Sequence, residues 1–269
     1  MKRLMNRSLQ IWMCVCAGAL AIGSAGSTAC AGKGPIVPPG TAAADQYLFA
    51  RANEEMKEEN WLDARTYFQQ IVDNYPNSAV RPDAKLGVGD AHLGEDTPES
   101  LVMAANEYKE FLQFYPTHAR ADYAQFKLAM THYEKMRAPQ RDQTDTVEAL
   151  KEFDVFFEKY PNSALMPEVR AKWRETRDRL TEASYLIGIF YFKQGWFPGA
   201  IPRFRQILAD DPGFSRMDGV YYHLAESILR ADKSKKAEAL PYFDRVLADY
   251  PMSAFVELAR VRVEELKIQ

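Results

Sequence analysis

Apolar side chains recur along the chain at offsets of four, three and four residues. Each run holds an alanine, an aromatic residue, another apolar residue and a closing tyrosine or aspartate. The five runs are Ala64, Phe68, Ile71, Tyr75; Ala104, Tyr108, Phe111, Tyr115; Ala149, Phe153, Phe156, Tyr160; Ala200, Phe204, Ile207, Asp211; and Ala239, Phe243, Val246, Tyr250. Steps of three and four residues place such side chains on one face of a helix. The pattern therefore predicts five helices that pack through equivalent faces.

Proline follows every run, at positions 76, 116, 161, 212 and 251. The residue before a proline disfavours helical dihedrals, so each of the five helices should end there. In two of the runs an aromatic residue, Trp61 or Phe197, stands three positions before the alanine. Each follows a short turn, which implies another helix before that turn. We therefore predict an all-α, tetratricopeptide-type solenoid of about five helix pairs. A capping helix over residues 254–267 closes it.

The repeat is longer and less regular than a plain tetratricopeptide unit. Successive prolines lie 40, 45, 51 and 39 residues apart, whereas the plain unit has about 34 residues. One insertion is the polar segment from Arg137 to Thr144, which contains Pro139. The other is a stretch over residues 168–192 that reads as a single long helix.

The first 29 residues are typical of a secretory signal. Lys2, Arg3 and Arg7 precede an apolar or small-residue run over positions 11–25. This run is short for a membrane span, although a genuine anchor helix is the alternative reading. Small residues then lead to Cys30.

Ser27-Thr28-Ala29-Cys30 resembles a bacterial lipobox, in which the cysteine becomes the first residue and carries lipid. An ordinary signal-peptidase cut nearby, leaving Cys30 as a plain thiol, is the alternative. Lipidation is favoured because Cys30 would be the only cysteine of the mature chain and has no disulfide partner. Residues 30–44 are then a lipidated N-terminus followed by a Pro/Gly/Ala-rich tether.

Charge and motifs argue against several function classes. Loss of residues 1–29 changes the formal net charge from −3 to −6, which disfavours nucleic acid as the main partner. Gly87-Val88-Gly89 lacks the rest of any phosphate-binding motif, and no zinc-ligand spacing links the four histidines. We expect no enzymatic activity, no metal and no cofactor.

The aromatic residues, 12% of the chain, remain as candidates for binding. Those on the repeated stripe should be core. Others lie on the first helices of pairs, which in a solenoid line the surface that holds extended peptides. Tyr47, Tyr123, Phe126 and Tyr133 are the candidates for a client-binding groove.

The lipobox and five such repeats together resemble the BamD family, the lipoprotein subunits of the β-barrel assembly machinery. The most specific stretches are Arg141-Asp142-Gln143-Thr144, Tyr160-Pro161-Asn162-Ser163 and Glu182-Ala183-Ser184-Tyr185, the last continuing through Tyr191-Phe192-Lys193-Gln194-Gly195. The departures are Ser27 in the lipobox and Asp211 in place of the repeat tyrosine. The second departure bears on the packing of the fourth turn.

The resemblance implies a role in outer-membrane protein assembly. Residues 45–163, the first three repeats, would bind unfolded outer-membrane protein clients. Residues 164–269 would dock the BamA-type barrel subunit, with Arg203, Tyr185 and Tyr191 as candidate contacts. The family also implies other assembly lipoproteins as partners, and a lipid anchor in the inner leaflet of the outer membrane, facing the periplasm.

A different periplasmic tetratricopeptide scaffold is the competing interpretation, for example one that coordinates cell-wall synthesis with envelope constriction. Such proteins tend to have an N-terminal coiled coil and no lipobox. Residues 31–44 show no heptads, so the assembly factor is preferred.

Overall fold

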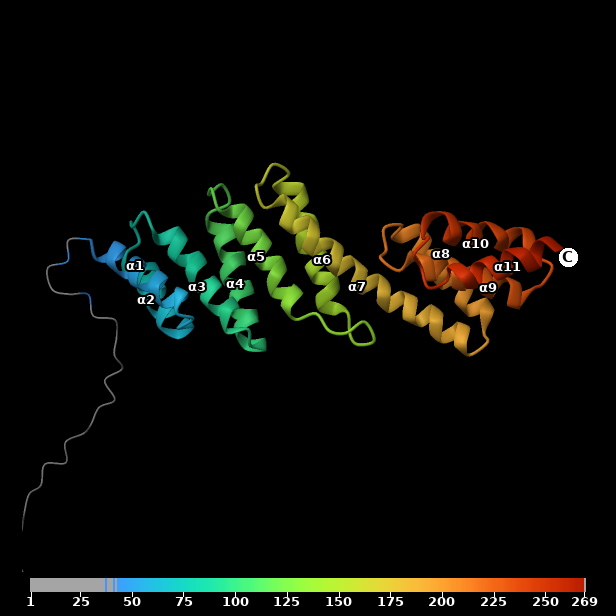
Figure 1. Cartoon of the computed structure of the whole chain (residues 1–269). Helices are drawn as coiled ribbons and strands as arrows, with labels where there is room; N and C mark the ends of the chain where they lie inside the picture. The colour runs from blue at the N-terminus through green and yellow to red at the C-terminus, as the bar shows by residue number, and fades with distance from the viewer. Residues whose placement is uncertain (1–36, 38–40, 42, 269) are drawn as a thin grey trace, which may run out of the picture. The chain divides into compact units, whose positions relative to one another are not determined.

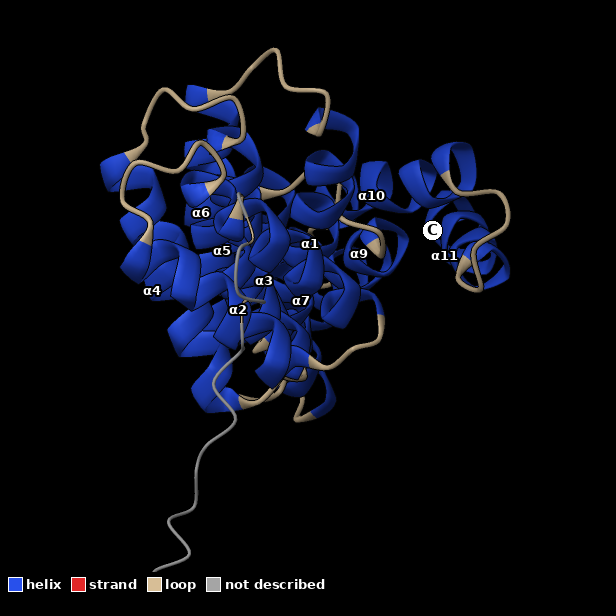
Figure 2. Cartoon of the chain, turned by 90° about the vertical axis from the view of Figure 1, so that its left-hand side faces the viewer, coloured by secondary structure: helices blue, strands red, loops and turns tan. Residues whose placement is uncertain are grey.

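The computed structural model describes residues 37, 41 and 43–268 (Figure 1). In this part of the chain every regular element is a helix (Figure 2). Each helix packs on the next along the sequence. The helices are α1 Ala44–Lys57, α2 Trp61–Asn74, α3 Arg81–Glu95, α4 Pro98–Phe114, α5 Ala121–Glu134, α6 Thr144–Lys159, α7 Met166–Lys193, α8 Phe197–Asp210, α9 Met217–Ala231, α10 Lys236–Asp249 and α11 Val256–Ile268. The prediction of five helix pairs and a capping helix is confirmed.

The predicted apolar stripe forms the core of the second helix in every pair. The five stripe alanines are fully buried, and each aromatic residue next to them is at most 2% exposed. An alanine lets the neighbouring helix approach closely, while burial of each ring stabilises the fold by about 2–3 kcal/mol. The tyrosine or aspartate that ends each run is the residue directly after the helix, as the following proline requires.

A serine two residues after the proline ties the end of a pair back to its beginning. Its hydroxyl donates to an aspartate in the first turn of the pair's first helix. The pairs are Ser78 with Asp45 at 2.6 Å, Ser163 with Asp122 at 2.5 Å and Ser253 with Asp218 at 2.5 Å. The same hydroxyl accepts a backbone N–H two residues ahead, so each serine also fixes the turn to the next helix.

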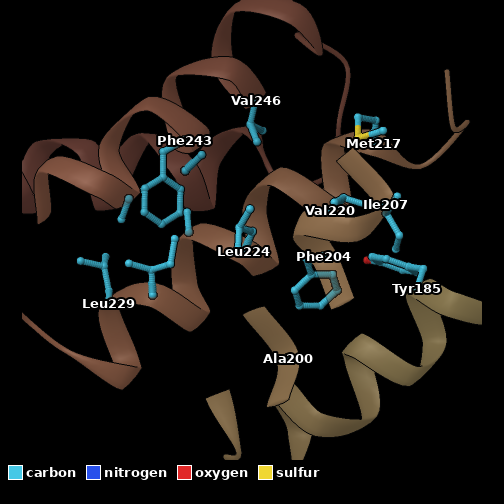
Figure 3. Packing of buried hydrophobic residues seen from close by; sticks show 14 of the residues in the cluster. Tyr185, Ala200, Phe204, Ile207, Met217, Val220, Leu224, Leu229, Phe243 and Val246 are labelled. Carbon is cyan, nitrogen blue, oxygen red and sulfur yellow. The ribbon is translucent and has the colours of Figure 1, made fainter. Parts of the chain in front are cut away.

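The long helix α7 belongs to two cores. Val169 and Trp173, near its N-terminus, pack with α5 and α6. Tyr185, near its C-terminus, packs with residues of α8 and α9 (Figure 3). Ile189 belongs to the same core, which extends to α10 and α11. Helix α7 runs without interruption from one core to the other, so the boundary between the two cores lies within this helix.

The helix bounds differ slightly from the sequence expectations. Helix α7 begins two residues earlier and ends one residue later than the predicted 168–192, because Pro167 fits its first turn. The capping helix begins at Val256 rather than at residue 254. Residues 1–29, Cys30 and most of the tether over 30–44 lie outside the described residues.

Candidate protein-binding surfaces

The described residues contain no group of three or more His, Cys, Asp or Glu side chains arranged to hold a metal ion. Across the same part of the chain, no helix combines the length and the apolarity that a membrane span needs. Aromatic and basic side chains form the candidate binding surfaces predicted from the sequence.

The candidate groove residues of the first three repeats differ in exposure. Tyr47 on α1, and Tyr123 and Tyr133 on α5, are half-buried. Phe126 is only 4% exposed, with its ring 6.4 Å from the ring of Phe153. The expectation that Phe126 lines a groove is wrong, because α5 packs on helices at both sides and its apolar face is correspondingly broad.

Tyr123 joins a partly buried polar network. Its hydroxyl donates to Asp90 at 3.0 Å, and the Tyr108 hydroxyl donates to the same carboxylate oxygen at 2.7 Å. Burial raises the pKa of Asp90, although these two hydrogen bonds and nearby basic side chains oppose the rise. Arg120 and Lys127 lie over the Tyr123 ring, 4.5 and 5.4 Å from its centroid. The ring is thus held by its hydroxyl while its face carries two cations.

Tyr133 is arranged in the same way. Its hydroxyl donates to Glu175 on α7 at 2.7 Å, and the Lys172 ammonium lies 4.5 Å from its ring centroid. Tyr123 packs on the core of α3–α5, whereas Tyr133 packs on that of α5–α7. These two tyrosines are therefore separate aromatic–cation contacts.

The candidate partner contacts of the later repeats also differ in exposure. Arg203 on α8 is exposed, and its guanidinium has no hydrogen-bond or salt-bridge partner among the described residues. Tyr185 is 1% exposed, packs against Phe204 with ring centroids 5.9 Å apart, and shares a hydrogen bond of 3.2 Å with His223 (Figure 3). The prediction of Tyr185 as a surface contact is wrong: it is a core residue.

Tyr191 is half-buried and belongs to an apolar surface that the sequence reasoning missed. Its ring meets Trp196 edge-on with centroids 4.9 Å apart. Trp196 is 55% exposed and Phe190 is 58% exposed. The sequence predicted Tyr191 as a partner contact, but not the exposure of its neighbours Phe190 and Trp196.

The stacked helix pairs, each closed by an alanine–aromatic stripe, define a tetratricopeptide-type repeat protein. A family described as outer membrane lipoprotein, named YfiO, has a model that matches residues 41–218. The chain belongs to this family. The resemblance to BamD noted from the sequence is thereby confirmed, since curated members bear that name.

Two relatives are called outer membrane protein assembly factor BamD. The one from Caulobacter vibrioides is 25% identical over 194 residues, which cover 72% of this chain and 62% of that protein. The one from Helicobacter pylori is 28% identical over 106 residues, 39% of this chain and 47% of that protein. The matched parts thus span less than two thirds of these relatives.

Among solved structures, the chain is similar to one described as the TPR2AB-domain:pHSP90 complex of yeast Sti1. The TM-score is 0.49 at 11% sequence identity, with 84% of each chain covered.

Proposed function

We propose that this protein is a lipoprotein component of an outer-membrane β-barrel assembly machinery that acts by binding other proteins. The observation that carries the proposal is the family match over residues 41–218, from the start of α1 into α9. Relatives named as assembly factors support it. Lipid on Cys30 would hold the protein at the periplasmic face of the outer membrane, because several acyl chains together anchor a protein stably.

The first three repeats, residues 45–163, are proposed to bind unfolded outer-membrane protein clients. Their half-buried tyrosines support this assignment. Arg120 and Lys172 lie over the rings of Tyr123 and Tyr133 and are also paired with Asp83 and Glu175. Each place therefore offers an aromatic side chain beside charged groups of both signs. Tyr47 would add a further aromatic contact on α1. A client segment that ends in an aromatic residue suits such contacts.

Residues 164–269 are proposed to dock the BamA-type barrel subunit. The unpaired guanidinium of Arg203 and the half-buried Tyr191 support this assignment. An arginine at the surface forms bidentate hydrogen bonds with a partner carboxylate and specifies its orientation. Other assembly lipoproteins would join the same complex.

A detergent pull-down of the tagged full-length protein, with mass spectrometry of the bound proteins, tests the proposal. We expect a β-barrel protein with periplasmic repeats among the main partners. Recovery of cell-wall synthases in its place would support the competing cell-wall scaffold instead.

The variant Arg203→Glu should no longer recover the barrel protein and should retain its helicity. Lys109→Glu, an equally exposed reversal on α4, should retain the barrel protein.

Lipidation is tested separately with Cys30→Ala. Labelled palmitate should enter the wild-type protein, and the variant should take up none and leave the membrane fraction. Equal labelling of both proteins would rule out Cys30 as the lipid site.

A further inference from the structure

A groove of about 440 Å³ runs between the α5–α6 loop and the C-terminal half of α7. Its lining is polar on the side of the loop and largely apolar on the side of the helix. The lining residues are Pro139, Gln140, Arg141 and Gln143 from the loop, and Ala183, Leu186, Ile187, Phe190 and Tyr191 from α7. The volume lies in the usual range for ligand sites, about 300–1,000 Å³.

Two polar side chains of the loop, those of Asp142 and Gln143, hold its shape. The Gln143 amide donates to the backbone carbonyls of Ala138 and Arg141 at 2.9 and 3.1 Å. The Asp142 carboxylate accepts from the backbone N–H and the hydroxyl of Thr144, which fixes the first turn of α6. The loop wall is therefore built by the chain's own contacts and needs no ligand to form.

A third contact holds this loop against α7. The Arg179 guanidinium donates to the backbone carbonyl of Arg137 at 3.1 Å. The spacing of the two walls is thus set at one end by a hydrogen bond between them. Such a preformed site loses less conformational entropy when it binds a ligand.

The Arg141 side chain is not used in this way. It is exposed, and its guanidinium has no hydrogen-bond or salt-bridge partner in the described part of the chain. It is also the only charged residue that lines the groove. Asp142, its neighbour, is occupied with Thr144. The groove therefore offers a ligand the positive charge of Arg141, which a carboxylate on the ligand would complement.

The helix wall is a stripe of uncovered apolar side chains. Ile187 is 43% exposed and Phe190 is 58% exposed. With Ala183, Leu186 and Tyr191 they follow the three- and four-residue spacing of one helix face. Contiguous exposed apolar surface on a soluble domain commonly marks a protein-binding site.

We propose that this groove binds an extended segment of another protein in which an acidic residue lies between aliphatic or aromatic residues. The apolar side chains would cover Ile187 and Phe190, and the carboxylate would pair with Arg141. The assignment goes beyond the proposed function, because the groove lies where the client-binding and partner-docking halves meet. The proposed ligand chemistry does not depend on which protein assembly the chain belongs to.

Fluorescence anisotropy with the full-length protein in detergent tests the ligand chemistry. The probe is an end-blocked, fluorescein-labelled octapeptide, Ser-Gly-Leu-Glu-Phe-Leu-Gly-Ser, with matched probes that carry Gln or Lys in place of Glu. We expect the wild type to bind the Glu probe about tenfold tighter than the Gln probe, as a charged hydrogen bond implies. Arg141→Glu should reverse the preference in favour of the Lys probe.

Phe190→Ser should weaken the binding of all three probes by about tenfold, since it removes most of one buried ring contact. Phe114→Ser on α4, where the ring is 66% exposed and outside the groove, is the control and should bind as the wild type does. The proposal is overturned if no probe binds, if Arg141→Glu keeps the wild-type preference, or if Phe190→Ser binds unchanged. None of these results alters the pull-down that tests the proposed function.

Discussion

Arg174 on α7 holds Asp211, the residue directly after α8, with a two-pronged ion pair. Its two terminal nitrogens lie 2.8 and 2.6 Å from the two carboxylate oxygens. Thr181 donates to the same carboxylate at 2.6 Å, and Asp211 is only 4% exposed. The aspartate that replaces the repeat tyrosine is therefore a buried, fully paired residue. The fourth turn is packed by polar contacts rather than by a ring.

Asp211→Asn should destabilise the fold by about 2 kcal/mol, because Arg174 keeps its charge and loses one of its two carboxylate partners, so that only Asp178 remains. Burial tends to raise the pKa of Asp211, but hydrogen bonds from Arg174 and Thr181 outweigh it, and the pKa is lowered. A lowered carboxyl pKa gives stability above the unfolded value near 3.8, which is lost as the pH falls through the folded value.

Urea unfolding followed by circular dichroism, at pH 7 and at pH values below 4, measures both effects. The difference between wild type and Asp211→Asn should shrink in acid. Asp210→Asn, a neighbouring exposed change, should match the wild type at both. An Asp211→Asn protein as stable as the wild type at pH 7 would show that the pair contributes nothing.

Gly188→Ala should destabilise the fold even though alanine favours helices. A methyl group at position 188 would lie 2.6 Å from Cε1 of Phe204, inside the core that joins α7 and α8. Overpacking of this kind costs about 1–3 kcal/mol, against about 1 kcal/mol gained in helix propensity. Ser184→Ala, on an exposed position of the same helix, has no such clash. In thermal unfolding, Gly188→Ala should have a lower Tm than the wild type and Ser184→Ala. A higher Tm than that of the wild type would contradict the close approach of Gly188 to Phe204.

Glu226→Gln should loosen the capping helix. Glu226 on α9 is 1% exposed and accepts hydrogen bonds from Arg230 at 2.9 Å and from Arg262 of α11 at 3.1 Å. Loss of its charge should speed hydrogen exchange of α11 amides about tenfold or more, since this pairing opposes local opening. Glu265→Gln, which removes only an exposed partner of Arg262, should have little effect. Unchanged exchange in α11 for Glu226→Gln would mean that apolar packing alone holds the cap.

His223 should make stability depend on pH as the pH falls through the unfolded histidine value of about 6.5 and below it. Burial lowers its pKa, with the Arg216 charge adding to the effect and a hydrogen bond to the Gly219 carbonyl opposing it. Because the folded pKa is depressed, the unfolded chain takes up a proton first as the pH falls below about 6.5. Stability should therefore fall on acidification by up to about 1.4 kcal/mol per pH unit.

His223→Gln removes this titration, so its stability should vary less with pH than that of the wild type. Burial also lowers the pKa of His92, but both proteins share that effect, so their difference isolates His223. Chemical unfolding at several pH values gives the comparison. If the stability of the two proteins varied with pH in parallel, His223 would be excluded as the source of the pH dependence.

The repeat could be predicted because its signal is local. The spacing of Ala64, Phe68 and Ile71, and its four copies, follows from the geometry of a single helix, and proline fixes where that helix ends. The exposure of individual aromatics could not be predicted in this way. Phe126 and Tyr123 lie one turn apart on α5, yet one is core and the other is half-buried.

The reason is that the first helix of a pair contacts helices on both sides. Its buried face is therefore broad, and the limits of that face depend on neighbours distant in sequence. Tyr185 is buried by Phe204 and His223, from two later helices. The groove beside Arg141 was missed for the same reason, since its two walls lie some 45 residues apart in the sequence.

The central claim is that the two halves of this protein bind two different kinds of protein. Site-specific photo-crosslinking in cells tests it most directly, with a crosslinking amino acid at position 47 or position 203. We predict that position 203 captures a single β-barrel protein with periplasmic repeats, and that position 47 captures several unfolded outer-membrane proteins. Capture of the same partner at both positions, or of cell-wall synthases at position 203, would contradict the claim.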